Sequence, residues 1–259
     1  NIPALVPPTD MNISGTPVYC LPVSSQTSTV TITTTNGVGT LTYAILSPVT
    51  ATGNTSGATS GIFTLLAPDT YTFQVTDANG CTYQESYTVA PVTNIAVALT
   101  GVSDVTCNET PALNNGSATF KVTDFTSYTA VLTTGTGTPV IAGDIVTLTG
   151  LAPDTYTLQV TDVTTGCTAD VSFAIAQPTV LGLTVVSNVN ANCNSGALVT
   201  VQGTGGTPSY TYAFVADGAT PLTTDYTTST SATLAVTLPS PNNYDVWVKD
   251  ANGCTFKLD

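Results

Sequence analysis

The segment Leu66-Ala67-Pro68-Asp69-Thr70-Tyr71-Thr72-Phe73-Gln74-Val75-Thr76-Asp77 recurs along the chain in similar copies, and this recurrence indicates the fold. Residues 151–162 repeat it with a single change, Leu158 in place of Phe73, and residues 238–250 carry a looser copy with one extra residue in the turn. The copies recur every 85 to 88 residues. This spacing is the size of one small domain, so the sequence predicts three tandem copies of the same unit.

Each copy is patterned as a set of short strands. In residues 28–33 the apolar Val30 and Ile32 alternate with Ser and Thr, as expected for a strand with one buried face. Runs of similar patterning, separated by Gly, Asn, Ser and Pro, predict further strands at 11–14, 41–46, 62–66, 71–76 and 82–89. Six or seven short strands per copy predict an all-β chain of three immunoglobulin-like or fibronectin III-like β-sandwiches.

The expected domain limits follow from the repeat. We expect sandwiches at residues 9–92, 93–179 and 180–259, with residues 1–8 as a linker or the tail of a preceding repeat. The third copy stops five residues after Cys254, so its last strand is expected to be cut short. Both ends therefore favour a window of a longer array, joined by short proline-containing linkers that limit bending.

A tyrosine follows the turn proline in each copy. The order Leu, Pro, then Tyr at the start of a strand resembles the tyrosine corner of immunoglobulin-like sandwiches, in which the ring is buried and the hydroxyl bonds to backbone upstream. We expect this role for Tyr71, Tyr156 and Tyr244.

The amino-acid composition limits the classes of function that can be expected. Threonine occupies 55 of 259 positions, only 7% of residues are charged, and the net charge is −13. With three basic residues, Lys121, Lys249 and Lys257, the chain lacks the clustered cations that neutralise nucleic-acid phosphates. It also lacks an apolar run of the 18 or more residues needed to cross a bilayer as a helix. Neither nucleic-acid binding nor membrane insertion of this segment is expected.

Six cysteines keep the period of the repeat. Cys20, Cys107 and Cys193 form one series, and Cys81, Cys167 and Cys254 form the other, with steps of 86 or 87 residues in both. The repeat favours one bridge inside each copy, namely Cys20–Cys81, Cys107–Cys167 and Cys193–Cys254, each fixing one end of its sandwich. Stable disulfides imply an oxidising, extracellular compartment. Metal binding is disfavoured because no CxxC motif and no histidine is present, so no cofactor is expected.

Other motifs have ordinary structural explanations. Asp-Ala-Asn-Gly at 77–80 and 250–253 could begin a calcium loop, but Asn-Gly is a favoured turn and no bidentate Glu follows. Trp247 with Tyr210 or Tyr212 could form a sugar-stacking platform, although core packing explains Trp247 better. Acid–base chemistry would depend on scattered aspartates in turns, since histidine and arginine are absent, so an enzyme is not expected.

The assembled motifs resemble a known family. Gly-Gly-Thr-Pro-Ser-Tyr-Thr-Tyr at 205–212 and Leu-Ala-Pro-Asp-Thr-Tyr-Thr-Phe-Gln-Val-Thr-Asp-Ala-Asn-Gly-Cys at 66–81 are similar to SprB-type repeats of giant cell-surface adhesins in gliding Bacteroidota. The first two copies lack the Gly-Gly-Thr-Pro segment. The resemblance implies export by the type IX secretion system, display outside the outer membrane as a filament, and attachment that drives gliding.

The function expected from the sequence is therefore a structural stalk segment of a secreted adhesin, whose partners are neighbouring repeats and an extracellular surface or polysaccharide. Two alternatives remain. The copies could themselves bind glycans, or the chain could be a pilus-like subunit that polymerises by strand addition of residues 1–8. Prolines at 3, 7 and 8 disfavour a donor strand, because proline cannot donate a ladder hydrogen bond.

Overall fold

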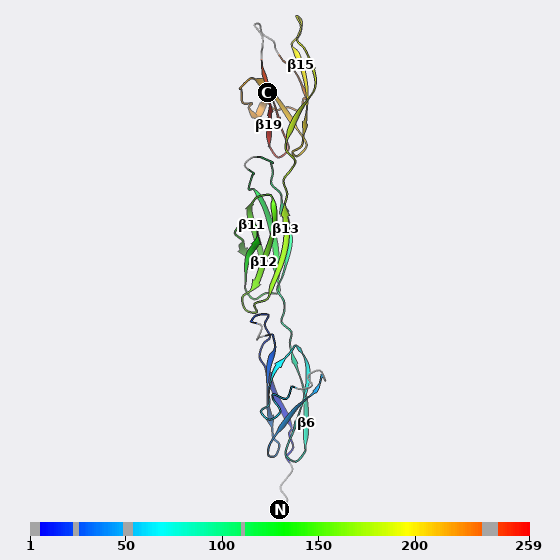
Figure 1. Cartoon of the computed structure of the whole chain (residues 1–259), viewed down its shortest axis with the longest axis vertical. Helices are drawn as coiled ribbons and strands as arrows, with labels where there is room; N and C mark the ends of the chain where they lie inside the picture. Colours follow the sequence, from blue (N-terminus) through cyan, green and yellow to red (C-terminus); the bar gives the residue numbers. More distant parts are fainter. Residues whose placement is uncertain (1–5, 23–25, 49–53, 110–111, 235–242) are drawn as a thin grey trace, which may run out of the picture. The chain divides into compact units, whose positions relative to one another are not determined.

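The computed structural model describes residues 6–22, 26–48, 54–109, 112–234 and 243–259 (Figure 1). In these ranges the regular elements are β-strands and one short 3-10 helix, η3 (Thr223–Asp225). Contacts divide the chain into two units. One contains Asn1–Val97, Val122–Ala130 and Gln159–Asp170, and the other contains Ala98–Lys121, Val131–Leu158 and Val171–Asp259. No helix in the described ranges is both long and apolar enough to span a membrane.

The first six strands form two three-stranded sheets with the orders β1-β2-β4 and β3-β5-β6. They are β1 (Asp10–Gly15), β2 (Ser28–Thr35), β3 (Thr42–Ser47), β4 (Ile62–Leu66), β5 (Asp69–Thr76) and β6 (Thr82–Val89). Alternate positions point inward, so that Val30, Phe63 and Phe73 are fully buried in one apolar cluster. The six strands predicted from the sequence of this copy are therefore present, with ends shifted by no more than two residues.

The next seven strands repeat this arrangement with one addition. They are β7 (Ala96–Ser103), β8 (Gly116–Thr123), β9 (Tyr128–Thr134), β10 (Val140–Ala142), β11 (Ile145–Leu151), β12 (Asp154–Asp162) and β13 (Thr168–Ile175). Their sheets have the orders β10-β11-β8-β7 and β13-β12-β9. Phe120 meets Phe173 edge to face at 5.1 Å between ring centroids. The short β10 extends one sheet at its edge.

The last six strands again form two sheets, β14-β15-β17 and β16-β18-β19. They are β14 (Gly182–Val189), β15 (Ala197–Thr204), β16 (Thr211–Ala216), β17 (Ser231–Leu234), β18 (Tyr244–Lys249) and β19 (Thr255–Leu258). β19 has four residues, against eight in β6 and eight in β13. The chain is thus all-β, with three immunoglobulin-like sandwiches, as the sequence predicted.

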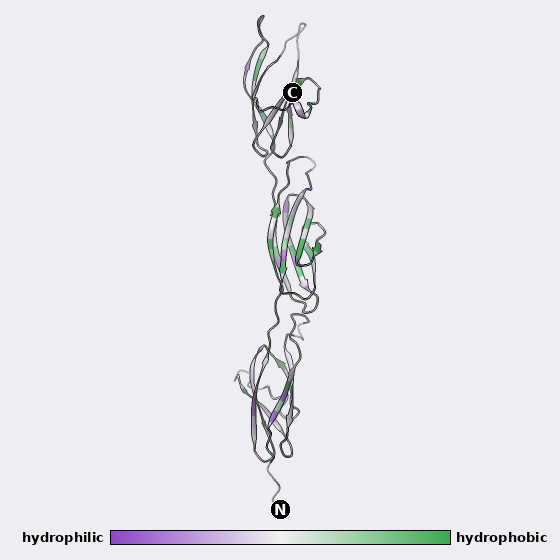
Figure 2. Cartoon of the chain, turned by 180° about the vertical axis from the view of Figure 1, so that it is seen from behind, coloured by the Kyte–Doolittle hydropathy of each residue, from purple (hydrophilic) through white to green (hydrophobic). Residues whose placement is uncertain are grey.

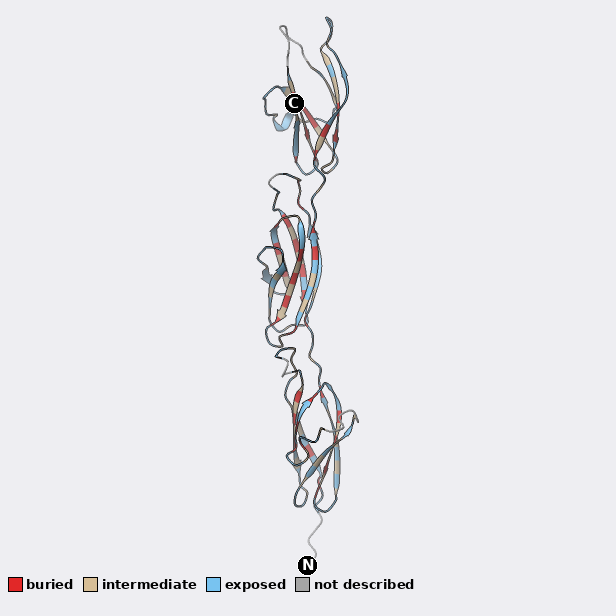
Figure 3. Cartoon of the chain, in the orientation of Figure 1, coloured by how far each residue is buried: buried red, intermediate tan, exposed pale blue. Residues whose placement is uncertain are grey.

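Burial follows the strands. Figure 3 shows the buried residues on the strands and mostly exposed residues in the loops, and Figure 2 shows strands of mixed polarity instead of continuous apolar runs. Such alternation is the pattern of antiparallel sheets with one face in a core and one in water.

The directions of the strands show at which end of the first sandwich each of its two cysteines lies. In the first copy Leu66, at the end of β4, pairs with Ser28 at the start of β2. β5 begins three residues later and runs for eight residues before the turn that contains Cys81. Since a strand rises about 3.3 Å per residue, β5 carries the chain about 26 Å away from that end. Cys20, in the loop that leads into β2, and Cys81, in the β5–β6 hairpin, therefore lie at opposite ends of one sandwich.

Candidate functional site

The distinctive chemistry of this chain lies in its disulfides. Bridges join Cys20 to Cys167 and Cys107 to Cys254, and both have a sequence separation of 147 residues. We call Cys20, Cys107 and Cys193 the loop cysteines, because each lies between the first two strands of a sandwich. Cys81, Cys167 and Cys254 are the hairpin cysteines, between the last two strands. Each bridge joins a loop cysteine to the hairpin cysteine of the next sandwich along the chain.

The predicted pairs Cys20–Cys81, Cys107–Cys167 and Cys193–Cys254 are wrong. The Cα atoms of a disulfide must lie within about 7 Å of each other, and the two cysteines of one sandwich are separated by about the length of a strand. Across the observed bridges the Cα atoms are 4.9 and 5.7 Å apart. Cys81, which is half-buried, and Cys193, which is exposed, carry free thiols. Each disulfide thus joins two sandwiches and does not close a loop within one sandwich.

A buried aspartate organises each hairpin. Asp77, Asp162 and Asp250 are all at most 5% exposed. In the third hairpin, Asp250 Oδ1 accepts hydrogen bonds from the backbone N–H groups of Cys254 (2.9 Å) and Asn252 (3.0 Å), and Oδ2 accepts one from Thr207 (2.9 Å). The carboxylate therefore fixes the turn that presents the cysteine.

The same hydrogen bonds set the acidity of two of these aspartates. Burial alone would raise the pKa of Asp77, but backbone N–H donors, that of Cys81 foremost, outweigh it and hold the pKa below the ordinary value of 3.8. Burial opposes ionisation of Asp162 in the same way, and hydrogen bonds led by the Thr126 N–H lower its pKa. Oxygens committed to backbone donors are poor cation ligands, so these contacts favour the turn interpretation of Asp-Ala-Asn-Gly over the calcium interpretation.

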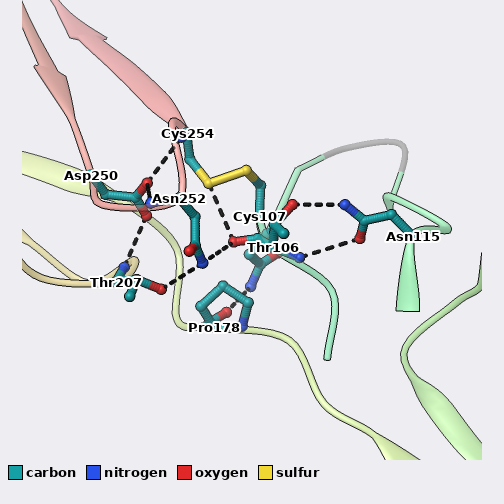
Figure 4. The surroundings of a disulfide bond; sticks show 9 residues. Thr106, Cys107, Asn115, Pro178, Thr207, Asp250, Asn252 and Cys254 are labelled. Carbon is teal, nitrogen blue, oxygen red and sulfur yellow. Dashed lines mark hydrogen bonds between the residues drawn. A yellow bond between two sulfur atoms is a disulfide. The ribbon is translucent and has the colours of Figure 1, made fainter. Parts of the chain in front are cut away.

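Figure 4 shows the second junction, around Cys107 and Cys254. The side-chain amide of Asn252 donates to the carbonyl oxygen of Thr106 (3.1 Å) and to Thr207 Oγ1 (3.0 Å), so one amide ties the hairpin to the loop of the preceding sandwich. The Sγ atom of Cys254 lies 3.3 Å from the same Thr106 oxygen. The hydrogen bonds of the Asn252 amide thus link the two sandwiches beside the disulfide.

Apolar contacts complete this junction. Cys107 belongs to the core cluster of the third sandwich, whose members include Leu183, Val201 and Val248, and Leu113 packs against that cluster. Cys107 and Cys254 are 8% and 6% exposed. The loop of one sandwich therefore closes the end of the next core, which buries the sulfur atoms away from water.

At the first junction, around Cys20 and Cys167, backbone hydrogen bonds join the two sandwiches. The N–H groups of Cys20 and Leu21 both donate to the carbonyl oxygen of Thr165, at 2.9 and 3.2 Å. Gly166 adopts a φ of +68°, and a Cβ on it would meet Leu21 Cβ at 2.8 Å. Cys167 is 1% exposed. An open cleft of about 560 Å³ lies beside this junction, with Tyr87 and Phe125 among its lining residues.

Two of the predicted corner tyrosines have the expected geometry. Tyr71 and Tyr156 are buried, and their hydroxyls donate to the carbonyl oxygens of Ala67 and Ala152, both at 2.9 Å. Burial, followed by the nearby aspartates at 69 and 154, raises the pKa of both hydroxyls. Those aspartates accept from the next backbone N–H in their turns, at 2.7 Å.

In the third copy Tyr244 begins β18 and is half-buried. The upstream backbone that its hydroxyl is predicted to bond falls in residues 235–242, outside the described residues. A second tyrosine, Tyr212, is 4% exposed, and its hydroxyl accepts from the Gly203 N–H at 2.9 Å. Tyr212 pairs with Val248 and Ala213 pairs with Trp247, so Tyr212 and Trp247 lie on opposite faces of the sheet. The structure does not bring them together as a sugar-stacking platform.

One charged cluster was missed by the sequence analysis. Carboxylate oxygens of Asp217, Asp245 and Asp259 lie within 4.8 Å of one another. Asp245 is 1% exposed and receives the ammonium of Lys257 at 3.2 Å and the Gly218 N–H at 3.0 Å. The hydrogen bond to Asp245 is the main cause that raises the pKa of Lys257. No spacing signal in the repeat reveals this group, because it occurs in one copy only.

No family model matches the chain, and no curated protein matches it. Solved structures similar to it include a three-immunoglobulin-domain fragment of titin, an E-to-A mutated variant, with a TM-score of 0.41 and 13% identity over 98% of this chain and 97% of that one. Protocadherin gamma B7 cadherin domains 1–4 match with a TM-score of 0.29 and 13% identity over 64% of this chain. Surface layer protein SbsC domains 4–9 match with a TM-score of 0.29 and 15% identity over 97%. The chain spans 50% and 47% of those last two chains.

Proposed function

We propose that this chain is a structural segment of an extracellular repeat protein that transmits tension along the chain. The observation that carries the proposal is the pairing of Cys20 with Cys167 and of Cys107 with Cys254, which joins each sandwich covalently to the next. Chemistry of this kind serves mechanical continuity and provides no reactive group for a substrate.

The two bridges bypass the linkers. Residues 90–95, between β6 and β7, form no regular element, and a pull along the chain would otherwise pass through them. With the first bridge intact, tension entering at Cys20 passes through sulfur to Cys167 and reaches the next sandwich directly. A cut or a stretch in the linker then leaves the connection in place.

The two disulfides also indicate the cellular compartment in which the protein resides. Two disulfides are stable where the surroundings are oxidising, and the net charge of −13 keeps an exposed protein soluble. A position outside the cell is therefore part of the proposal. The partners it requires are the neighbouring sandwiches of the chain itself.

The more specific assignment depends on the resemblance of residues 66–81 and 205–212 to SprB-type repeats. We propose that the chain belongs to the stalk of a cell-surface adhesin on the exterior of a Bacteroidota outer membrane, where it holds an adhesive region at a distance. Export by type IX secretion and a part in gliding belong to this proposal as well.

The test is a tether held by its two ends. A protease site is inserted between Ala90 and Pro91, which are both exposed, and the chain is stretched between a bead and a surface. Protease should cut the linker and leave the tether intact, because the Cys20–Cys167 bridge spans the cut, and reductant should then release the bead.

The matched controls locate the load in one bond. The Cys20→Ser/Cys167→Ser double variant should lose the bead on proteolysis alone, whereas Cys81→Ser, which removes a free thiol, should behave like the parent chain. Loss of the bead from the parent chain on proteolysis without reductant would refute the proposal that the bridge transmits tension.

A further inference from the structure

The free thiols of Cys81 and Cys193 occupy the same positions in their sandwiches as bridged cysteines do elsewhere. Cys81 is a hairpin cysteine like Cys167 and Cys254, and Cys193 is a loop cysteine like Cys20 and Cys107. The chain thus carries one unpaired cysteine of each complementary kind.

The Cys81 hairpin is built in the same way as a hairpin that is already bridged. Residues 77–82 and 250–255 have the same sequence, Asp-Ala-Asn-Gly-Cys-Thr. The aspartate carboxylate accepts from the cysteine N–H at 2.9 Å in both, and the aspartate N–H donates to the cysteine carbonyl at 3.0 Å in both. The Cys81 thiol is therefore presented in the geometry that forms a bridge at Cys254.

The Cys81 and Cys254 hairpins differ in how far neighbouring residues bury the cysteine. Asn252 uses its side-chain amide on Thr106 of the preceding sandwich, and Cys254 is 6% exposed. Asn79 and Asn252 are both exposed, but Cys81 is half-buried where Cys254 is buried. In the part of the chain that the structure describes, the sulfur of Cys81 is therefore the more accessible of the two.

Apolar side chains near Cys193 are exposed. Val189 pairs with Leu198 where β14 and β15 approach the loop of Cys193, and these side chains are 55% and 39% exposed. At the equivalent end of the second sandwich, Cys107 and Leu113 pack into the next core. Exposed apolar side chains around a free thiol fit a surface that another sandwich covers.

We propose that Cys193 and Cys81 are the two halves of a further bridge of the same kind, by which the Cys193 end of one chain joins the Cys81 hairpin of a second copy. The reaction is thiol–disulfide exchange with a small-molecule disulfide such as oxidised glutathione. One thiolate attacks it and releases one glutathione thiol, and the second thiolate displaces the other, so that one disulfide is reduced as one is formed. This inference rests on the proposed function, and the tether test examines that function separately.

The experiment uses the full chain in a glutathione redox buffer, followed on non-reducing gels. The parent chain should give a ladder of multimers that reductant collapses. Cys81→Ser alone and Cys193→Ser alone should stay monomeric, whereas an equal mixture of the two should stop at a dimer, in which peptide mapping finds Cys193 joined to Cys81.

Two results would overturn the inference. One is an absence of dimer in the mixture, while both variants keep the parent melting temperature. The other is dimerisation of either single variant as fast as the mixture, because random collisions of exposed thiols would then explain the cross-link. In either case the tether can still survive linker cleavage, so the two proposals fail independently.

Discussion

Asp250 and Cys254 are joined by a 2.9 Å hydrogen bond from the cysteine N–H to the aspartate carboxylate, and the sulfur of that cysteine closes the bridge to the preceding sandwich. A buried carboxylate thus positions the half-cystine that links two sandwiches. Equivalent bonds occur in the Cys81 hairpin, and Asp162 accepts from Thr164 and Thr165 in the Cys167 hairpin. The junction depends on the hairpin as much as on the sulfur.

Asp250→Ala should destabilise the third sandwich by about 3 kcal/mol, because it leaves several backbone donors without their charged acceptor. Urea unfolding of the oxidised chain measures the change. Asp69→Ala is the matched control, since Asp69 is exposed and accepts one local N–H, and it should cost less than about 1 kcal/mol. Equal effects of the two substitutions would show that the buried carboxylate does not organise the hairpin.

Stability should fall in acid. The pKa values of Asp77 and Asp162 are lower in the folded chain than the ordinary 3.8, so the folded state binds fewer protons than the unfolded state as that value is approached. Their contribution is fully present above about pH 4 and is lost as the pH falls through the folded pKa values. Melting temperatures at pH 7, 5 and 3 should therefore be level at first and then drop. The drop should be smaller in Asp77→Asn, and an equal drop in that variant would contradict this origin.

Substituting two glycines at the same hairpin position distinguishes the cost of a left-handed backbone conformation from the cost of a close contact. Gly253 has a φ of +88° with no atom within 4 Å of an added Cβ, whereas Gly166 has a φ of +68° and faces Leu21 of the neighbouring sandwich. Gly253→Ala should cost only the left-handed conformation, about 1 kcal/mol, and Gly166→Ala should cost more because Leu21 must shift. Urea midpoints compare them. Equal losses would mean that Leu21 and the hairpin do not meet closely in solution.

Lys257→Met should lower the melting temperature, because it leaves the carboxylate of Asp245, 1% exposed, without its cation. Lys121→Met provides the control. Its ion pair with Asp144 spans 3.7 Å between side chains that are 54% and 51% exposed, where water screens the charges. Thermal unfolding followed by circular dichroism should therefore show a loss for Lys257→Met alone. A matching loss for Lys121→Met would indicate a general effect of net charge.

Local sequence patterns predicted the strands, the number of copies and the two cysteine series. Alternation in residues 28–33 predicted β2, the Leu-Ala-Pro-Asp-Thr-Tyr turn predicted the buried Tyr71, and the period separated loop cysteines from hairpin cysteines. These features are local, since they depend on side-chain alternation and turn chemistry within a few residues.

The pairing of the cysteines, by contrast, depends on how the strands are arranged in three dimensions. The period is satisfied equally by a bridge inside one copy and by a bridge to the next. Four strands separate Cys20 from Cys81, so simple up-and-down alternation would bring them to the same end. Instead β3 and β4 both run toward the end where Cys20 lies, as their pairings with β5 and β2 show, and this leaves Cys81 at the far end. Direction across a connection between two sheets is set by packing and not by local sequence, and it places the bridges between sandwiches.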